Sequence, residues 1–214
     1  MTTDLADAFV RLHARLAPVP LTPEIVLHQA DEPIGLWELT EGEFRSEQPP
    51  PFWAFAWAGG QGLARYVLDN PSVVAGRRVL DVACGSGLVG IAAAKAGAAS
   101  VRAVDIDPLS IAAVGVNAAA NGVTVKADLA DILDGPADAD VVLAGDVFYS
   151  QAFATRMFGF LRRARKAGAD AYAGDPGRAF RPGSAGTEVA TYEVPTTMAL
   201  ESVTKKQTSV WRLP

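Results

Sequence analysis

One segment of this chain, VLDVACGSGLVG at residues 79–90, sharply limits how the chain can fold. An apolar strand pattern contains the acidic residue Asp81, and a glycine turn at Gly85 and Gly87 then opens an alanine-rich helical pattern. In α/β proteins, such a strand, turn and helix bring the backbone close to a nucleotide, because glycine lacks a Cβ atom. The segment therefore predicts an α/β fold with a nucleotide-binding turn.

The same glycines, together with Gly90, also fit the G-x-G-x-x-G fingerprint of NAD-binding proteins, which is a weak signal by itself. Asp81 favours a different cofactor. Its carboxylate would repel a diphosphate, whereas S-adenosylmethionine (AdoMet) carries an ammonium and a sulfonium group. We therefore predict that Asp81, Gly85 and Gly87 bind AdoMet. The alternative is that Asp81 only caps a turn and that the glycines only close it.

The length and composition predict one domain. With 214 residues, 50% of them hydrophobic, the chain can bury one complete core. We expect an N-terminal helix and extension at 1–50, followed by an AdoMet-binding catalytic core at 51–214. The chain begins with polar and acidic residues and has no run of about 18 apolar residues, so we expect no leader peptide and no membrane span. A cytoplasmic monomer is the expectation.

The charged residues and the cysteine count argue against several kinds of partner. The net charge of −5, from 19 Lys and Arg against 24 Asp and Glu, predicts no general affinity for nucleic acid. The single cysteine, Cys84, excludes an internal disulfide and argues against a cysteine-built metal site. His13 and His28 lie far from the glycine turn in sequence and show no metal-ligand spacing, so we expect no metal.

Hydrophobic periodicity predicts the remaining elements. Residues 4–17 show the pattern of an amphipathic helix that ends at Pro18 and Pro20, short strands are expected within 24–45, and a helix is expected over 60–69. From residue 77 onward strands and helices alternate. The later strands are predicted at 101–106, 123–127, 140–144 and 169–174, with helices starting at 108 and spanning about 151–167. The last two segments, 188–194 and 208–213, are strand-like with no helix between them, which predicts an antiparallel hairpin.

Short apolar strands that alternate with helices imply a buried parallel sheet with right-handed crossovers and helices on both faces. Five parallel strands and a closing antiparallel pair give the Rossmann-like, seven-stranded sheet of class I methyltransferases. In such a sheet the ligand site lies at the carboxyl ends of the strands.

Polar residues follow the predicted strands where an AdoMet site needs them. Asp105 is placed to accept both ribose hydroxyls, while its rival Asp107 precedes a proline and is the better helix cap. Asp128 is placed to accept from the adenine amino group, or else is a helix cap or solvated acid. Trp57 is predicted to pack on the methionine part of AdoMet through cation–π contact, and Trp53 is a weaker candidate. Alternatively, these aromatic residues only cover the sheet edge.

The fourth strand ends in Gly-Asp-Val-Phe-Tyr, in which Asp146 and Tyr149 can both point into the pocket. For amine methylation we assign Asp146 to capture and orientation of the amine, with the proton lost to water. Tyr149 would orient the nitrogen and exclude solvent. The alternative is that Asp146 caps the next helix and that Tyr149 packs in the core.

Two further basic features have simpler interpretations. Arg178, in the turn after the fifth strand, either binds an acidic protein substrate or pairs with Asp175. The basic residues at 162–166 are interpreted as a solvated helix face.

Five segments together resemble the lysine methyltransferases of the electron transfer flavoprotein β subunit. They are FWAFAWAGGQGLARYVLDNP (52–71), VLDVACGSG (79–87), AVDIDP (103–108), GDVFY (145–149) and GDPGR (174–178), in the order of that family. The likeness runs from about residue 45 to the C-terminus, and its most specific parts are WAGGQ at 57–61 and GDPGR. The family places an Asp-x-x-Tyr motif after the fourth strand, which Asp146 and Tyr149 match.

This resemblance implies an AdoMet-dependent enzyme that methylates lysine ε-amines of a folded protein. The implied partner is the electron transfer flavoprotein β subunit, with a ribosomal protein as an alternative substrate. Three other hypotheses stay open: a small-molecule or amide N-methyltransferase, an NAD-dependent oxidoreductase and a catalytically silent binding module. The first is disfavoured because the loop lacks the Pro-Pro of Asp/Asn-Pro-Pro-Tyr sites.

Overall fold

The computed structural model of the protein describes residues 3–31, 50–183 and 186–214. Its central feature is a seven-stranded sheet with the strand order β5-β4-β3-β6-β7-β9-β8. The strands are β3 (Arg78–Val82), β4 (Ser100–Asp105), β5 (Lys126–Leu129), β6 (Val141–Gly145), β7 (Asp170–Asp175), β8 (Thr187–Pro195) and β9 (Lys205–Arg212). The first five are parallel, and β9 pairs antiparallel with both β7 and β8. The predicted fold class and terminal hairpin are confirmed.

The direction of strand addition reverses at β3. From this strand, β4 and β5 extend the sheet on one side, while β6 and β7 extend it on the other. The crossing connections leave a crevice at the carboxyl ends of the strands, where ligands bind in open α/β sheets. The segment at 79–90 lies at this switch point, because it contains β3 and the turn that follows it.

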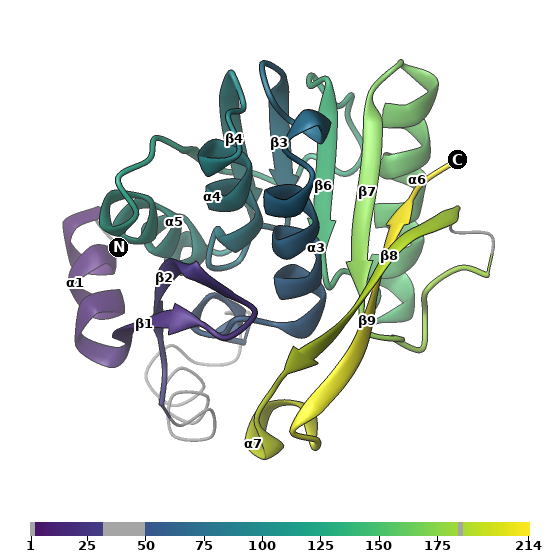
Figure 1. Ribbon diagram of the computed structural model, residues 1–214. Helices are drawn as coiled ribbons and strands as arrows, with labels where there is room; N and C mark the ends of the chain where they lie inside the picture. Colours follow the sequence, from purple (N-terminus) through teal and green to yellow (C-terminus); the bar gives the residue numbers. More distant parts are fainter. Residues whose placement is uncertain (1–2, 32–49, 184–185) are drawn as a thin grey trace.

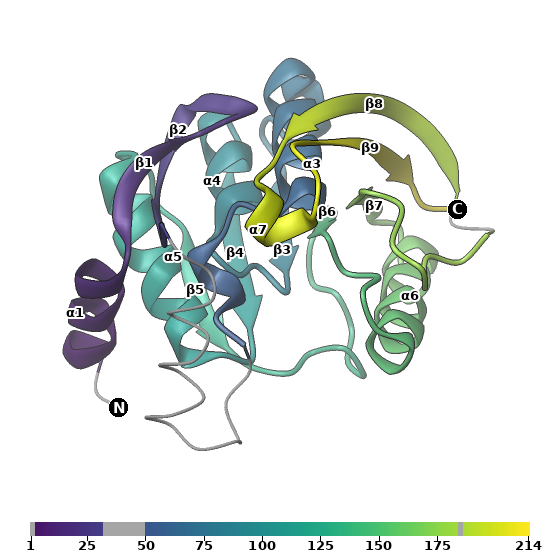
Figure 2. The same ribbon diagram turned by 90° about the horizontal axis from the view of Figure 1, so that it is seen from below.

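Helices cover both faces of the sheet. Helices α3 (Ala58–Asp69), α4 (Leu88–Lys95) and α5 (Pro108–Ala120) lie on one face, and α6 (Gln151–Lys166) lies on the other (Figures 1 and 2). Leu63, Ile91 and Leu143 belong to the core of the first face, whereas Phe148 and Phe160 belong to that of the second. Both faces of the parallel strands are thus buried, which explains their nearly continuous apolar sequences.

The N-terminal segment differs from the prediction. Helix α1 (Thr3–His13) ends four residues before the expected position, and Arg15–Val19 forms strand β1, antiparallel to β2 (Thr22–Gln29). Proline disfavours helical conformation in the residue before it, so Pro18 and Pro20 favour an extended segment that pairs with β2. The part of the predicted strand region at 32–45 lies outside the described residues.

Two smaller expectations were also wrong. Strand β5 begins at Lys126, not at residue 123, after a turn in which Gly122 has a φ of 65°. A short helix, α7 (Met198–Glu201), lies between β8 and β9, where no helix was expected. Figure 1 shows α7 at the tip of the β8–β9 hairpin, below the carboxyl ends of the parallel strands. The hairpin therefore brings α7 to the same edge of the sheet as the switch point.

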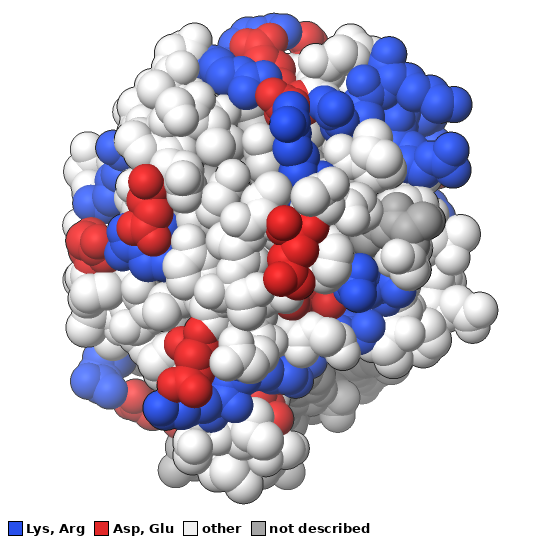
Figure 3. Space-filling view, turned by 45° about the vertical axis from the view of Figure 1, so that its right-hand side comes forward, with Lys and Arg blue, Asp and Glu red and all other residues white. Residues whose placement is uncertain are grey.

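Basic side chains gather near the amino ends of the parallel strands, on the side opposite the switch point. The last turn of α6 contains Arg163, Arg165 and Lys166, and Figure 3 shows Lys and Arg grouped at its upper right, over this end of the helix. Part of this group is tethered, since Arg165 pairs with Asp170 at 3.0 Å. In the described part of the chain, no helix has both the length and the apolar character needed to cross a membrane.

Candidate active site

A cavity of about 380 Å³ lies at the carboxyl ends of β3, β4 and β6. Pockets of this size, with mostly apolar walls and a few polar groups, hold small ligands and cofactors. The predicted site residues that line it are Trp57, Asp81, Gly85, Asp105, Asp146 and Tyr149. The structure therefore brings together the predicted cofactor residues and the predicted catalytic pair.

The glycine turn leads from β3 into α4 as predicted. Gly85 lines the cavity, and its N–H donates to Oδ2 of Asp105 at 2.9 Å. Gly87 has a φ of 80° and forms the N-cap of α4. A Cβ atom at Gly87 would come within 3.0 Å of Val114 on α5, and Gly87 is not among the residues that line the cavity. Gly85 thus faces the ligand space, whereas Gly87 lets the turn pack on α5.

Asp81 lies beneath this turn and is only 1% exposed. Its Oδ2 accepts a hydrogen bond from the N–H of Gly90 at 2.8 Å. Burial raises the pKa of Asp81 to about 8, although the Gly90 N–H opposes this shift. A cation bound in the cavity would favour the ionised form, so a positively charged ligand would lower the pKa of Asp81 again.

Asp105 and Asp107 have different surroundings. Asp105 ends β4, and its two carboxylate oxygens accept from the N–H groups of Gly85 and Asp107. Desolvation by burial raises the pKa of Asp105. Asp107 is the N-cap of α5, because its Oδ1 accepts from the N–H of Leu109 at 2.8 Å and Pro108 begins the helix. Asp105 thus ties the end of β4 to the glycine turn at the cavity wall, while Asp107 is engaged as the predicted cap.

Asp128 lies outside the cavity lining, whereas Asp131 is part of it. Asp128 belongs to strand β5, and its side chain pairs with Arg102 of the neighbouring strand at 2.6 Å. Asp131 lies just past the end of β5, and its carboxylate accepts from the N–H of Leu133 and pairs with Arg156. The structure thus does not bring Asp128 to the other predicted residues. Asp131, which shares the segment DLAD with Asp128, was not among the predicted residues.

Trp57 and Trp53 also take different places. Trp57 lines the cavity, where its Nε1 donates to the carbonyl of Phe52 at 3.0 Å and its backbone forms the N-cap of α3. Trp53 is completely buried and packs edge-on against Phe9 of α1. Trp57 is thus placed to contact a ligand, and Trp53 belongs to the core.

Asp146 has an uncommon backbone conformation. Its φ of 60° lies in the left-handed region, which Asp adopts more readily than most residues. In this conformation its Oδ2 accepts from the N–H of Gly59 at 3.0 Å. The side chain therefore points back toward the N-terminus of α3 instead of capping α6, whose N-cap is Ser150.

Tyr149 lies at the mouth of the cavity and is 46% exposed. Its ring packs between Phe52 and Phe153, with centroids 5.4 and 5.2 Å away. Desolvation and the nearby carboxylates of Asp105 and Asp146 raise the pKa of Tyr149 to about 12. Its hydroxyl is therefore neutral at ordinary pH and can donate or accept a hydrogen bond. The alternative of a tyrosine packed in the core is wrong.

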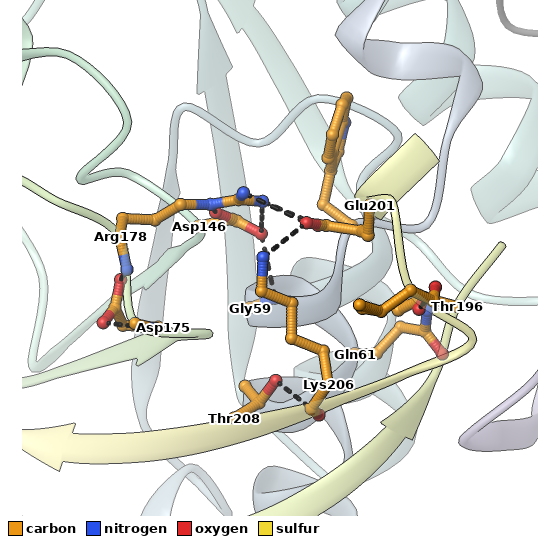
Figure 4. A network of polar contacts seen from close by, with 12 residues as sticks. Gly59, Gln61, Asp146, Asp175, Arg178, Thr196, Glu201, Lys206 and Thr208 are labelled. Atoms are coloured by element: carbon orange, nitrogen blue, oxygen red, sulfur yellow. Dashed lines mark hydrogen bonds and ion pairs between the residues drawn. The ribbon is translucent and has the colours of Figure 1, made fainter. Parts of the chain in front are cut away.

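The side chain of Arg178 joins Asp146 to Glu201 of α7 (Figure 4). Of the two interpretations of Arg178, the side-chain pair with Asp175 is wrong. Asp175 pairs with Arg181 at 3.3 Å and accepts from the backbone N–H groups of Gly177 and Arg178, not from the Arg178 guanidinium. Glu201 was not predicted, because it lies 23 positions beyond Arg178 in a segment without a motif.

These surroundings fit AdoMet. The cavity wall combines the N–H-rich glycine turn with the carboxylates of Asp81 and Asp105, which favour the cationic groups of AdoMet. Exposed Ile106, at 63%, adds an apolar surface beside Asp105. Asp146 and Tyr149 line the same cavity.

Comparisons with known proteins support this assignment. The ribosomal protein L11 methyltransferase family model matches residues 64–147. Among solved structures, a T. thermophilus 16S rRNA methyltransferase in complex with AdoMet and guanosine superimposes with a TM-score of 0.57 at 18% identity, covering 94% of this chain and 50% of that chain. This likeness shows the class I methyltransferase fold.

Closer relatives come from vertebrates. The electron transfer flavoprotein beta subunit lysine methyltransferase of Danio rerio is 41% identical over 162 residues, which are 74% of this chain and 62% of that protein. The enzyme of the same name from Xenopus laevis is 38% identical over 178 residues, which are 80% of this chain and 70% of that protein. The predicted resemblance is confirmed, and the chain belongs to the electron transfer flavoprotein beta subunit lysine methyltransferase family of AdoMet-dependent class I methyltransferases.

Proposed function

We propose that this protein is an AdoMet-dependent protein-lysine N-methyltransferase whose substrate is the electron transfer flavoprotein β subunit. One observation carries the proposal: a single cavity joins the glycine turn and Asp105 to Asp146 and Tyr149. The names of the relatives support the same activity and substrate. The match to the ribosomal protein L11 methyltransferase model favours a ribosomal protein as the second candidate substrate.

The cofactor would be held by the half of the cavity below the glycine turn. We assign Asp105 to the ribose hydroxyls, Gly85 to close backbone approach, and Trp57 and Asp81 to the cationic end. For the adenine amino group we assign Asp131 in place of Asp128, because only Asp131 lines the cavity. When bound, AdoMet supplies a methyl group on a cationic sulfur, and the amine lone pair forms the N–C bond as the S–C bond breaks and leaves its electron pair on sulfur.

The residues of the chain position the acceptor amine. The remaining acceptor capacity of Asp146 can take one N–H of the ε-amine, and the hydroxyl of Tyr149 can bind the nitrogen from the mouth of the cavity. The aromatic rings of Phe52, Tyr149 and Phe153 pack together at that mouth, where they would limit the access of water once the substrate is bound. Because the reaction is an in-line displacement, orientation of this kind can supply most of the acceleration.

The test incubates purified protein with labelled AdoMet and either the electron transfer flavoprotein or ribosomal protein L11, followed by mass spectrometry of lysines. We expect methyl-lysine on the flavoprotein β subunit and none with Asp146→Ala. If only L11 is labelled, the ribosomal protein replaces the flavoprotein β subunit as the proposed substrate. Absence of methyl-lysine on both proteins would contradict the proposed function, and methylation of a small molecule alone would replace it.

A further inference from the structure

Arg178 is clamped between two carboxylates (Figure 4). Its Nε and Nη2 donate to Asp146 at 2.6 and 3.0 Å, and its Nη1 and Nη2 donate to Glu201 at 3.1 and 2.7 Å. Nζ of Lys206, on β9, also donates to Glu201 at 2.8 Å. The side chains of Asp146 and Glu201 are only 6% and 2% exposed. The guanidinium therefore compensates two buried negative charges at once.

Arg178 has little capacity left for an outside ligand. A guanidinium carries five N–H groups, and Arg178 already makes four hydrogen bonds to Asp146 and Glu201. Its Cζ also lies 5.9 Å from the ring centre of Trp57. Burial alone would lower the pKa of Arg178, but the two carboxylates raise it above its ordinary value, so the group stays charged. Its partners are thus within the protein and not on an acidic substrate.

Asp146 keeps one acceptor position. Its Oδ2 accepts from Gly59 and Arg178, and its Oδ1 accepts from Nε of Arg178. A carboxylate offers about four lone-pair positions, so one position on Oδ1 stays open to an N–H donor. Because Arg178 neutralises the charge, this position can accept a hydrogen bond without acting as a full counter-ion.

This distinction matters for methyl transfer to an amine. A free lysine has a pKa of about 10.4 and must lose a proton before its nitrogen can attack. A bare carboxylate at hydrogen-bond distance would raise that pKa further, typically by roughly 1–3 units. A compensated carboxylate does so much less.

The charged groups around Asp146 balance within the described structure. Three carboxylates meet three cations, each within 3.3 Å of a partner. Tyr149 and Asp105 line the same cavity as Asp146. The carboxylates of Asp105 and Asp146 both raise the pKa of the Tyr149 hydroxyl. The balanced set consists of Asp146, Asp175 and Glu201 with Arg178, Arg181 and Lys206.

We propose that Arg178 is a positioning residue for the acceptor lysine, because it neutralises Asp146 and so lets the bound ε-amine lose its proton. Glu201 acts one step further away, because its negative charge offsets part of the positive charge of Arg178. The proton passes to water, and the neutral amine keeps one N–H on Oδ1 of Asp146 while its lone pair stays free for the methyl group. The inference rests on the proposed lysine methylation and assigns a role to the clamp between the sheet and α7.

The test measures kcat against pH for the wild type, Arg178→Gln, Arg178→Lys and Glu201→Gln, with the flavoprotein as substrate. We expect the rising limb of the kcat–pH profile, where the amine loses its proton, to move to higher pH by roughly 1–3 units in Arg178→Gln. In Glu201→Gln it should move to lower pH, because the charge of Arg178 is then less offset. Arg178→Lys keeps the charge, so its limb stays in place. Arg178→Gln should also bind the flavoprotein more tightly at pH 7, measured by calorimetry without methyl transfer, because the bare Asp146 then holds the ammonium.

Opposite shifts in the two variants cannot arise from a general loss of structure. Variants that lose kcat without any movement of the limb, or whose limbs move in the same direction, would overturn the proposal. If Arg178→Gln does not fold, Lys206→Met removes a cation from the more exposed end of the cluster and should give a smaller shift in the same direction. A wild type that methylates no lysine at any pH would instead overturn the proposed function, and this inference with it.

Discussion

The backbone N–H of Gly59 donates to Oδ2 of Asp146 at 3.0 Å, although 87 positions separate the two residues. The contact depends on a very close approach between α3 and the ends of β6 and β7. A Cβ atom on Gly59 would lie 2.5 Å from the carbonyl oxygen of Gly174 and 2.7 Å from the backbone nitrogen of Asp146. The WAGGQ segment therefore has a steric explanation: only glycine at position 59 lets the N-terminus of α3 reach Asp146.

This geometry predicts different effects of alanine at two adjacent glycines. Gly59→Ala should lower the free energy of unfolding by about 1–3 kcal/mol, because backbone atoms must move. Gly60→Ala is the matched control: its nearest neighbour would be the Leu88 side chain at 3.9 Å, and alanine favours the helix by about 0.5–1 kcal/mol. Urea unfolding of the two variants measures both effects, and a Gly59→Ala protein as stable as Gly60→Ala would contradict the explanation.

The cofactor assignment predicts a difference between two acidic residues. Asp105→Asn should weaken AdoMet binding about 10- to 100-fold, as expected for lost hydrogen bonds to a charged group. Asp128→Asn should leave the affinity unchanged, because Asp128 is engaged with Arg102 outside the cavity. Isothermal titration calorimetry with AdoMet measures both. A larger loss in Asp128→Asn than in Asp105→Asn would refute the assignment and restore the role that the sequence alone suggested for Asp128.

Much of the cofactor site could be predicted from local sequence patterns. The strand, turn and helix around Gly85 are contiguous, and Asp105 follows at the end of the next strand, 20 positions later. Asp107 could be recognised as a helix cap because the residue itself and Pro108 contain the whole signal. Such features are predictable since each of them depends on neighbours within a few residues.

The polar clamp at the catalytic end was not predictable in this way. Arg178 meets Glu201 only because the β8–β9 hairpin brings α7 to the carboxyl edge of the sheet. No local pattern indicates that fold-back, and Glu201 resembles any other acidic residue in the sequence. The choice between Asp128 and Asp131 likewise depended on where β5 ends, and the periodicity placed that strand three residues too early at its start.

The role assigned to Tyr149 predicts a loss of rate without a loss of structure. Tyr149→Phe keeps the contacts to Phe52 and Phe153 but removes the hydroxyl, so kcat should fall about tenfold or more while stability changes by less than about 0.5 kcal/mol. Tyr192→Phe is the control, since its hydroxyl contacts Asp69 outside the cavity. Steady-state kinetics with the flavoprotein would decide, and full activity of Tyr149→Phe would remove the hydroxyl from the mechanism.

The buried Asp81 predicts how stability depends on pH in the absence of cofactor. Its pKa is raised from an ordinary 3.8 to about 8, so between these values the folded protein holds a proton that the unfolded chain has released. Stability therefore falls as pH rises through this window, by up to about 1.4 kcal/mol per pH unit. Asp81→Asn cannot titrate and still offers an acceptor to Gly90. The melting temperature of Asp81→Asn should therefore rise relative to that of the wild type as pH increases from 4.5 to 8.5.

Asp140 gives the matched control for this effect. Its side chain is 40% exposed, and its hydrogen bonds with Arg78, first from the backbone N–H and then from the guanidinium, lower its pKa. The stabilisation from such a group is present above its ordinary pKa and is lost only as pH falls through the lowered value. Asp140→Asn should therefore melt below the wild type by a constant margin from pH 4.5 to 8.5. A constant margin for Asp81→Asn as well would mean that the carboxyl beneath the glycine turn does not carry a proton at neutral pH.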